Sequence, residues 1–553
     1  MTNSRQHTPI DRVAEAWVDT LVAHDPTLGT YIGRPGGGLP DYSPEGSAAF
    51  ADAQRSVLAE LEAATPVDTV DAVTRADLIA ELRLGLAQHE AGEDLRDLNV
   101  IESPLQQIRD SFDLMPTADE AGWADIGERL RAIPAALAGY RESLGVGAAR
   151  GLAPALRQVT EVAAQTRRTA GTAAAPGFFG KLAAGQGTEL ETAAGAASRA
   201  YAELADFLEA DLAPRATATD AFGRERYALA SEAFLGAKVD LDETYEWGLE
   251  ELARMVDEQE RIAAEIVGGA RRPGIVAEAI AQLEQDESRK LRCTDALQRW
   301  MQETSDRAVA ELAETQFDIP QEIRALECMI APTQEGGIYY TGPSDDFSRP
   351  GRMWWSVPEG VTEFDTWREL TTVYHEGVPG HHLQIGQAVV NRGTLNEWRR
   401  QLAGTSGHAE GWALYAERLM EQLGYLDDPA DRLGMLDGQR MRAARVVLDI
   451  GVHLGKPHPE GGVWDGDKAF AFMAQHVNMN DGFVRFEVLR YLGWAGQAPS
   501  YKVGQRIWEQ LRDEAAAQAG AAFDIRDFHR DALALGGVRL DTLERSLRGE
   551  LGV

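Results

Sequence analysis

The stretch from Tyr374 to His382 reads Tyr-His-Glu-Gly-Val-Pro-Gly-His-His and gathers three histidines and a glutamate. In the ordinary His-Glu-x-x-His motif, two histidines four residues apart share one helix face and bind one Zn²⁺. The glutamate between them activates the metal-bound water. Here Pro379 occupies the position of the second histidine. The stretch therefore predicts a metal site whose helix departs from the ordinary geometry.

The proline also supplies a physical reason for that departure. Proline lacks an N–H and clashes with the carbonyl four residues back, here that of His375, so the helix must kink or end. Gly380 eases either outcome. If the Pro-Gly pair loops out, the spacing between His375 and His381 becomes that of the ordinary motif. His381 is therefore the preferred second ligand, and His382, on the same face of a straight helix as His375, is the alternative.

A hydrolytic zinc site needs a third protein ligand and an open position for water. The segment from Gly407 onward reads Gly-His-Ala-Glu-Gly-Trp-Ala-Leu-Tyr-Ala-Glu and carries Glu410 and Glu417 on one helix face, two turns apart. Glu410 lies near the helix start and close to flexible Gly407, which favours it as the third ligand. Glu417 and His408 are the alternatives.

These two segments, His-Glu-x-x-Pro-Gly-His-His-Leu-Gln and Glu-Gly-Trp-Ala-x-Tyr-x-Glu, resemble a large bacterial family known as a domain of unknown function. That family is grouped with the gluzincin-like, mostly helical zinc metallopeptidases. The resemblance implies peptidase-like hydrolysis with one zinc ion per chain, and gluzincins take their third ligand from the helix after the His-Glu helix. Further stretches that fit the family are Tyr339-Tyr340 with Ser348-Arg349-Pro350-Gly351, Arg442 to His453, and Arg490 to Gly504.

The remaining chemical roles follow from position. Glu376, beside the first ligand, is the expected general base that takes a proton from zinc-bound water and delivers it to the leaving amine. His453 and Tyr501 are the candidates for stabilising the negatively charged intermediate. The competing interpretations are a structural histidine paired with Asp449 and an ordinary half-buried tyrosine.

Arginine side chains are the candidates for binding a substrate carboxylate, because a guanidinium binds it through two parallel hydrogen bonds. Arg349, Arg352 and Arg490 are expected in this role. Arg442 and Arg445 share a helix face with Asp449 and His453 at 3-4-4 spacing. These two either contact substrate or hold neighbouring carboxylates in place.

A predicted strand precedes the His-Glu helix. Residues Gly336 to Thr341, including Tyr339 and Tyr340, are rich in β-formers and bounded by turn residues. Gluzincins bind extended substrates along a strand beside the metal helix, so this strand is expected to contact substrate. A plain structural hairpin with Arg352–Val357 is the alternative.

The fold class follows from the periodicity of the apolar residues. Helical patterning dominates from Asp11 to about Cys328, and helices are expected again over residues 364–378, 409–423, 438–454 and 484–492. The chain is predicted to be mainly α, a large helical metallopeptidase-like fold with a small β element next to the active-site helix. Residues 1–329 are expected to form a helical wall of the cleft, and 330–553 the metal-binding region.

Composition excludes several partners. The net charge of −34 argues against nucleic acid and against an anionic membrane surface, since both need Lys/Arg-rich surfaces. The chain shows neither a signal peptide nor a run of about 20 apolar residues. Its two cysteines, Cys293 and Cys328, suit a reducing compartment. A cytoplasmic location is predicted.

The sequence thus predicts a zinc-dependent hydrolase of short peptides. A hydrolase of a non-peptide amide or ester would have the same site with different pockets. A metal- or peptide-binding protein without catalysis is disfavoured by Glu376, which ligand duty alone does not require. The sequence does not determine the substrate, the position of cleavage in a peptide, or the oligomeric state.

Overall fold

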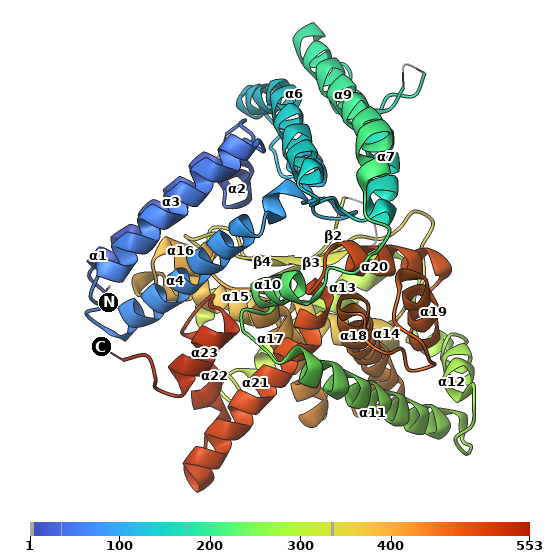
Figure 1. The fold of residues 1–553 in the computed structure, drawn as a ribbon. Helices are drawn as coiled ribbons and strands as arrows, with labels where there is room; N and C mark the ends of the chain where they lie inside the picture. The colour runs from blue at the N-terminus through green and yellow to red at the C-terminus, as the bar shows by residue number, and fades with distance from the viewer. Residues whose placement is uncertain (1–4, 35, 173, 333–336, 553) are drawn as a thin grey trace.

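The computed structural model describes residues 5–34, 36–172, 174–332 and 337–552. It is mainly helical with a few short strands, which confirms the predicted fold class (Figure 1). The helices before the metal motif are α1 (Pro9–His24), α2 (Pro26–Tyr31), α3 (Pro44–Ala63), α4 (Thr69–Glu90), α5 (Pro104–Asp110), α6 (Glu120–Ala149), α7 (Leu156–Ala170), α8 (Phe178–Leu182), α9 (Thr188–Phe207), α10 (Arg224–Leu235), α11 (Leu241–Val267), α12 (Ile275–Leu283) and α13 (Thr294–Leu312).

The remaining helices carry the metal motif and the elements around it. They are α14 (Thr366–Glu376), α15 (His381–Val390), α16 (Glu397–Gln401), α17 (Ser406–Gln422), α18 (Pro429–Leu454), α19 (Gly466–His476), α20 (Asp481–Gly493), α21 (Gln497–Ala519), α22 (Ile525–Leu533) and α23 (Leu540–Leu547). The last of them, α23, packs against α4, so the end of the chain returns to the N-terminal helices (Figure 1).

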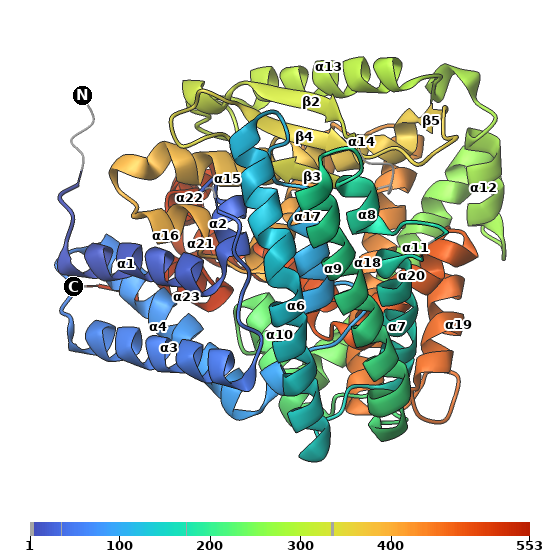
Figure 2. The same cartoon turned by 90° about the horizontal axis from the view of Figure 1, so that it is seen from above.

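Two groups of packed helices surround the larger hydrophobic cores, and a smaller core lies among α1, α3, α4 and α16. In the first, α6, α7 and α9 lie side by side and enclose a hydrophobic core of their own (Figures 1 and 2). In the second, α11 lies along α18, and α17 lies along α21. The largest core cluster belongs to this second group and draws residues from Val73 to Leu551. It therefore contains residues from both sides of the expected boundary at 329/330, and the division into two regions stays a prediction.

A small sheet lies beside the metal motif. Strands β2 (Leu326–Ile330), β4 (Gly351–Trp355) and β3 (Ile338–Thr341) are ordered β2-β4-β3, with β2 parallel and β3 antiparallel to β4. Helix α13 covers the β2 edge, where the side chains of Gln298 and Gln302 donate to backbone carbonyls of Cys328 and Leu326, both at 2.8 Å. Strand β3 is the other edge. A separate pair joins β1 (Lys290–Leu291) to β5 (Phe364–Asp365).

Several predicted boundaries are corrected. Strand β2 begins before the expected end of the helical segment at about Cys328, and Gly336 of the predicted strand falls outside the described residues. Helix α14 begins only after β5 and ends at Glu376, earlier than expected. Helix α18 begins at Pro429, nine residues before the expected start, where the Asp428 side chain accepts from the backbone N–H of Ala430.

Helices long and apolar enough to cross a lipid bilayer do not occur among the residues that the structure describes.

Candidate metal site

The metal motif contains a helix break where the sequence predicts one. Helix α14 ends at Glu376, the Val378–Pro379 peptide bond is cis, and α15 begins at His381. The backbone N–H of Gly380 donates to the carbonyl of Tyr374 at 3.0 Å. A Cβ at Gly380 would lie 1.8 Å from the carbonyl oxygen of His375, so only glycine fits there. The break turns His381 back toward the end of α14.

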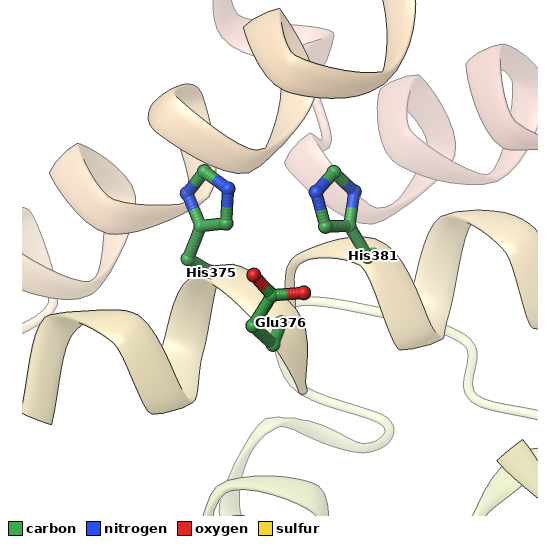
Figure 3. Close-up of side chains that lie close together, drawn as sticks. All are labelled: His375, Glu376 and His381. Atoms are coloured by element: carbon green, nitrogen blue, oxygen red, sulfur yellow. The ribbon is translucent and has the colours of Figure 1, made fainter. Parts of the chain in front are cut away.

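His375, Glu376 and His381 come together at this break. Each contributes one potential ligand atom, and these atoms lie within 4.8 Å of one another. The two rings lie side by side with the carboxylate of Glu376 between them (Figure 3). Helix α17 adds Glu410, whose Oε2 lies 3.3 Å from His375 Nε2 and 3.6 Å from His381 Nε2. The structure therefore brings the preferred ligands and the predicted base into one cluster.

The donor set fits a divalent cation such as Zn²⁺. Ligand atoms bound tetrahedrally at about 2.0–2.2 Å lie roughly 3.3–3.6 Å apart, and the two Glu410–histidine distances, 3.3 and 3.6 Å, fall in this range. Glu410 Oε2 and His381 Nδ1 are buried without a hydrogen-bond partner among the described residues. Unsatisfied buried polar atoms are costly, and a cation at this point would relieve the cost for Glu410.

Buried carboxylates give the site a negative field. Burial alone would lower the pKa of His375, but its contacts with Glu410 and Glu417 outweigh that effect and raise this pKa to about 10. Burial raises the pKa of Glu376, and the negative charge of Glu410 acts in the same direction. Three carboxylates around two histidines leave an excess of negative charge, which a divalent cation would neutralise.

Glu417, the alternative ligand, lies on the other side of the His375 ring. Its Oε1 is 2.8 Å from His375 Nδ1, and its Oε2 accepts from Gln439 at 3.2 Å. Lys502 in turn donates to Gln439 Oε1 at 2.6 Å and lies 3.0 Å from Glu251. Carboxylates that bind the outer nitrogen of a metal-binding histidine fix its orientation and tautomer. Glu417 therefore positions His375 and does not face the cluster.

His382, the other alternative ligand, is fully engaged elsewhere. Its Nδ1 lies 2.9 Å from the hydroxyl of Tyr340, and its Nε2 lies 2.9 Å from the carbonyl of Ile323. Burial lowers its pKa to about 4, so the ring is neutral. A Cβ at Gly351 would lie 2.2 Å from the Tyr340 hydroxyl, so glycine at the start of β4 makes room for this contact. His382 and Tyr340 thus join α15 to the sheet, and neither side chain faces the cluster of His375, His381 and Glu410.

Trp412 holds the break in place. Its indole N–H donates to the carbonyls of Pro379 at 2.9 Å and Gly380 at 3.2 Å. Trp412 is fully buried. Trp412 lies two residues after Glu410 in the second motif, and this position is the one feature of the sequence that could have indicated a role near the site. One helix, α17, therefore supplies both a candidate ligand and the group that shapes the first motif.

The second alternative third ligand, His408, is also excluded from the cluster. Its Nδ1 lies 3.3 Å from the amide nitrogen of Gln384, its ring packs on Trp508, and burial lowers its pKa to about 3.

His453 is placed as a structural histidine. Its Nδ1 accepts from the backbone N–H of Phe222 at 3.3 Å, and its Nε2 lies 3.1 Å from the carbonyl of Tyr491. Burial lowers its pKa to about 4. Asp449 accepts from the Tyr227 hydroxyl at 2.7 Å and from the backbone N–H of Gly496 at 2.9 Å. With both ring nitrogens engaged by the backbone, His453 has no atom to offer a reaction intermediate.

Arg445 and Arg490 are also held by hydrogen bonds to other side chains in the interior. Arg445 donates to Tyr491 at 2.6 Å and to Glu487 at 2.8 Å. Arg490 donates to Glu487 at 2.9 Å and to Gln497 at 2.7 Å. These arginines connect α18, α20 and α21 and do not reach the cavity that adjoins the metal cluster.

That cavity encloses about 370 Å³ and opens beside the cluster. Tyr501 and Arg442 line it together with His375, Glu376 and Glu410. Burial and the negative charge of Glu410 raise the pKa of Tyr501 to about 12, so its hydroxyl stays protonated and can donate a hydrogen bond. Of the two candidates for stabilising an intermediate, only Tyr501 lies at the site.

The other predicted substrate contacts are not at the cavity. Tyr339 is 42% exposed and stacks on Trp354. Arg349 donates to the carbonyl of Pro350 at 3.3 Å, and Arg352 pairs with Glu327 at 2.7 Å. The sheet nevertheless reaches the cavity through Ile338, the first residue of β3.

A second cavity of about 460 Å³ lies between α3, α4 and α10. Aromatic side chains such as Phe234 and Trp494 line it together with Asp94 and Asp97. It shares no lining residue with the cavity at the metal cluster, so the two are separate features of the molecule.

Comparisons with known proteins agree with this fold. A family model described as a bacterial protein of unknown function (DUF885) matches residues 26–547. No curated protein matches the chain. A candidate lipoprotein from Colwellia psychrerythraea has a similar structure, with 22% identity, a TM-score of 0.84 and coverage of 99% of this chain and 100% of that one. A candidate lipoprotein of unknown function from Shewanella oneidensis is also similar, with 16% identity, a TM-score of 0.76 and coverage of 98% and 100%.

Both solved structures are described as lipoproteins, a class of proteins anchored at a membrane or exported. This description contradicts the cytoplasmic location predicted from the sequence, and that prediction is wrong.

Proposed function

The chain belongs to the DUF885 family of bacterial proteins, whose function is unknown, and from its site we propose that it is a metal-dependent hydrolase of short peptides. The observation that carries the proposal is the meeting of His375, His381 and Glu410 around one point with Glu376 beside them. A carboxylate next to a ligand set of two histidines and a glutamate is the arrangement of a water-activating site.

His375, His381 and Glu410 would hold the ion, which is proposed to be zinc at one per chain. When bound, zinc lowers the pKa of a coordinated water to about 7. Glu376 is buried, and no hydrogen bond to another described side chain holds its carboxylate. It is therefore free to accept a proton from a water at the site and to pass that proton to the departing amine.

Tyr501 and Glu417 complete the machinery in different ways. The protonated Tyr501 hydroxyl is the donor that would stabilise negative charge on the attacked carbonyl oxygen. Glu417 acts through His375 by accepting from its outer nitrogen, so it is a positioning residue. The exposed edge of β3, which reaches the cavity at Ile338, would align an extended peptide beside the cluster.

Replacing Glu376 with Gln tests the proposal. The variant keeps size and hydrogen-bonding shape but loses the base, so we expect kcat/KM on a responsive di- or tripeptide to fall by about 10²- to 10⁴-fold. Zinc content, measured by elemental analysis, should stay near one ion per chain. Glu359→Gln is the matched control, since Glu359 is exposed and lies outside the cavity.

Two results would count against the proposal. If Glu376→Gln retains zinc and hydrolyses the same peptide at the wild-type rate, the role of Glu376 is wrong. If the purified wild-type protein contains no metal and takes up none, the ligand assignment is wrong.

A further inference from the structure

We infer that the cavity beside the metal cluster selects di- and tripeptides whose two termini are both free, with Glu369 binding the ammonium group and Arg442 binding the carboxylate. This inference rests on the proposed function for its substrate, but it concerns binding and is tested by binding.

Glu369 is a carboxyl group in the wall of the cavity whose pKa burial raises to about 7, and a bound ammonium group would favour its charged form. It lies on α14 seven residues before Glu376, so the two side chains share a helix face about 10 Å apart. No hydrogen bond or ion pair joins Glu369 to another residue that the structure describes. Its neighbour Arg368 is directed instead toward Asp437 at 3.7 Å and Glu284 at 3.5 Å. Thr371, next along the wall, is 7% exposed, and its buried hydroxyl has no hydrogen-bond partner within the described ranges.

Arg442 is an unpaired guanidinium in the same wall. It lies on α18, and its side chain faces the ring of Tyr501 with 5.8 Å between the guanidinium carbon and the ring centre. Its Nε is buried without a hydrogen-bond partner, and no carboxylate of the described residues lies within ion-pair distance. Arg442 is half-buried, but its buried Nε has lost water without gaining a partner among the described residues, which is costly, and a carboxylate that binds the guanidinium would remove that cost.

The register of α14 and α18 sets the separation of the two charges. Gly434 packs against the carbonyl of Trp367 near the start of α14, and Arg442, later on α18, acts on Glu376 at the end of α14, so the two helices run in the same direction. The side chain of Arg442 lies near that of Glu376 and acts on its pKa. Glu369 and Arg442 are therefore at opposite ends of the cavity, about two helical turns or roughly 10 Å apart along the axis.

A short zwitterionic peptide matches this spacing. Each extended residue spans about 3.3–3.6 Å, and each terminal ion pair adds roughly 3 Å between heavy atoms. A dipeptide or tripeptide can therefore reach from Glu369 to Arg442 while its peptide bond lies beside Glu376. The cavity volume of about 370 Å³ is of the same order as such a ligand. A blocked terminus would leave one charge in the wall unpaired.

Isothermal titration calorimetry on the zinc-loaded Glu376→Gln variant tests the inference without turnover. The probes are L-alanyl-L-alanine, its N-acetyl derivative and its C-terminal amide. The free dipeptide should bind about 10- to 100-fold more tightly than either blocked form, because each block removes one charged hydrogen-bonded pair.

Second substitutions assign the two ends. Adding Glu369→Gln should weaken the free dipeptide by about 10-fold or more and abolish its advantage over the N-acetyl form, while its advantage over the amide remains. Adding Arg442→Gln should also weaken the free dipeptide, but it should abolish the advantage over the amide and leave the advantage over the N-acetyl form. Glu359→Gln and Arg199→Gln, at exposed positions outside the cavity, should change none of the three affinities.

The inference is overturned if the variant binds none of the probes, if it binds blocked and free peptides equally, or if Glu369→Gln weakens all three by the same factor. The binding inference and the proposed hydrolase activity can fail independently. If the protein binds peptides according to their terminal charges but the wild type hydrolyses none, the binding inference holds and the proposed activity is wrong. If the wild type hydrolyses free and blocked peptides equally well, the proposed activity holds and the binding inference is wrong.

Discussion

His381 and His382 are adjacent in the chain, but their surroundings give them different chemistry. The Nε2 of His381 points toward Glu410 and its Nδ1 has no hydrogen-bond partner among the described residues, whereas both nitrogens of His382 are held by Tyr340 and Ile323. A ring whose two nitrogens are already engaged cannot bind an ion without breaking those bonds. The hydrogen-bond partners of each ring therefore determine which of the two histidines is available to bind an ion.

Substitution by alanine should separate the two histidines. We expect His381→Ala to lose stoichiometric zinc, because a site left with two protein ligands binds weakly. We expect His382→Ala to keep about one zinc per chain and to lose about 2–4 kcal/mol in the free energy of unfolding, since it leaves a cavity and two unpaired polar groups. Elemental analysis after gel filtration and urea unfolding provide the two readouts. Zinc lost from His382→Ala and kept by His381→Ala would reverse the assignment.

The buried neutral His453 should make stability depend on pH. Its pKa is lowered to about 4 in the folded protein, against an ordinary value near 6.5. The unfolded chain therefore takes up a proton that the folded chain does not between these values. The stability contribution of the neutral ring is present above pH 6.5 and is lost as the pH falls toward 4.

The measurement is urea unfolding of the wild type and His453→Gln at pH 7.0, 5.5 and 4.5. Between the extremes, the wild type should lose up to about 3 kcal/mol more than the variant. Other buried histidines are common to both proteins and cancel in the difference. Parallel pH curves for the two proteins would show that His453 is not held neutral.

At the scale of elements, the break between α14 and α15 depends on contacts from both motifs. Gly380 lets the backbone pass against the carbonyl of His375, and Trp412 on α17 donates to the carbonyls that the break exposes. The orientation of His381 therefore follows from the path of the backbone.

Gly380→Ala is expected to disrupt this path. The added Cβ would lie 1.8 Å from the His375 oxygen, so α14 and α15 must move apart, at a cost of more than about 2 kcal/mol. Zinc binding should fall with it. Gly195→Ala on α9 is the control, since its nearest neighbour outside its own helix backbone is Arg199 Nη1 at 3.7 Å. That variant should match or exceed wild-type stability. A Gly380→Ala protein with full zinc and unchanged unfolding would contradict the geometry described for the break.

The parts that could be predicted from the sequence are those fixed by local chemistry. Pro379 and Gly380 indicated the break, and the spacing after it indicated His381. Strand β2 was missed because its five residues are stabilised by parallel pairing with β4, more than twenty residues later. The structural role of His453 depends on backbone groups of Phe222 and Tyr491, which no local pattern connects to it. The same is true of Glu369, which matters because no hydrogen bond or ion pair joins it to another residue in the described part of the chain.

At the scale of the whole molecule, the metal cluster is assembled from α14, α15 and α17 and is held by α18 and α21 through Gln439 and Lys502. Negative charge is concentrated at its centre. Without a cation, these buried carboxylates repel one another inside the core, and the helices that carry them are less firmly held together.

Removing the metal should therefore lower the melting temperature. A ligand that binds only the folded state at about 1,000 times its Kd adds about 4 kcal/mol. We expect chelation to lower Tm by several degrees and added Zn²⁺ to restore it, as measured by differential scanning calorimetry. His375→Ala should show no response to either treatment. An equal response in that variant would place the stabilising ion elsewhere.

Helices α17 and α21 meet through glycine. A Cβ at Gly411 would lie 2.5 Å from the backbone of Gly504, and a Cβ at Gly504 would lie 2.3 Å from the carbonyl of Gly407. The backbones of α17 and α21 are thus in direct contact, and this contact sets the distance between Glu410 and Tyr501. A protein engineer who redesigns the interior for stability must therefore keep Gly407, Gly411 and Gly504, because a larger residue at this crossing would push the helices that carry Glu410 and Tyr501 apart.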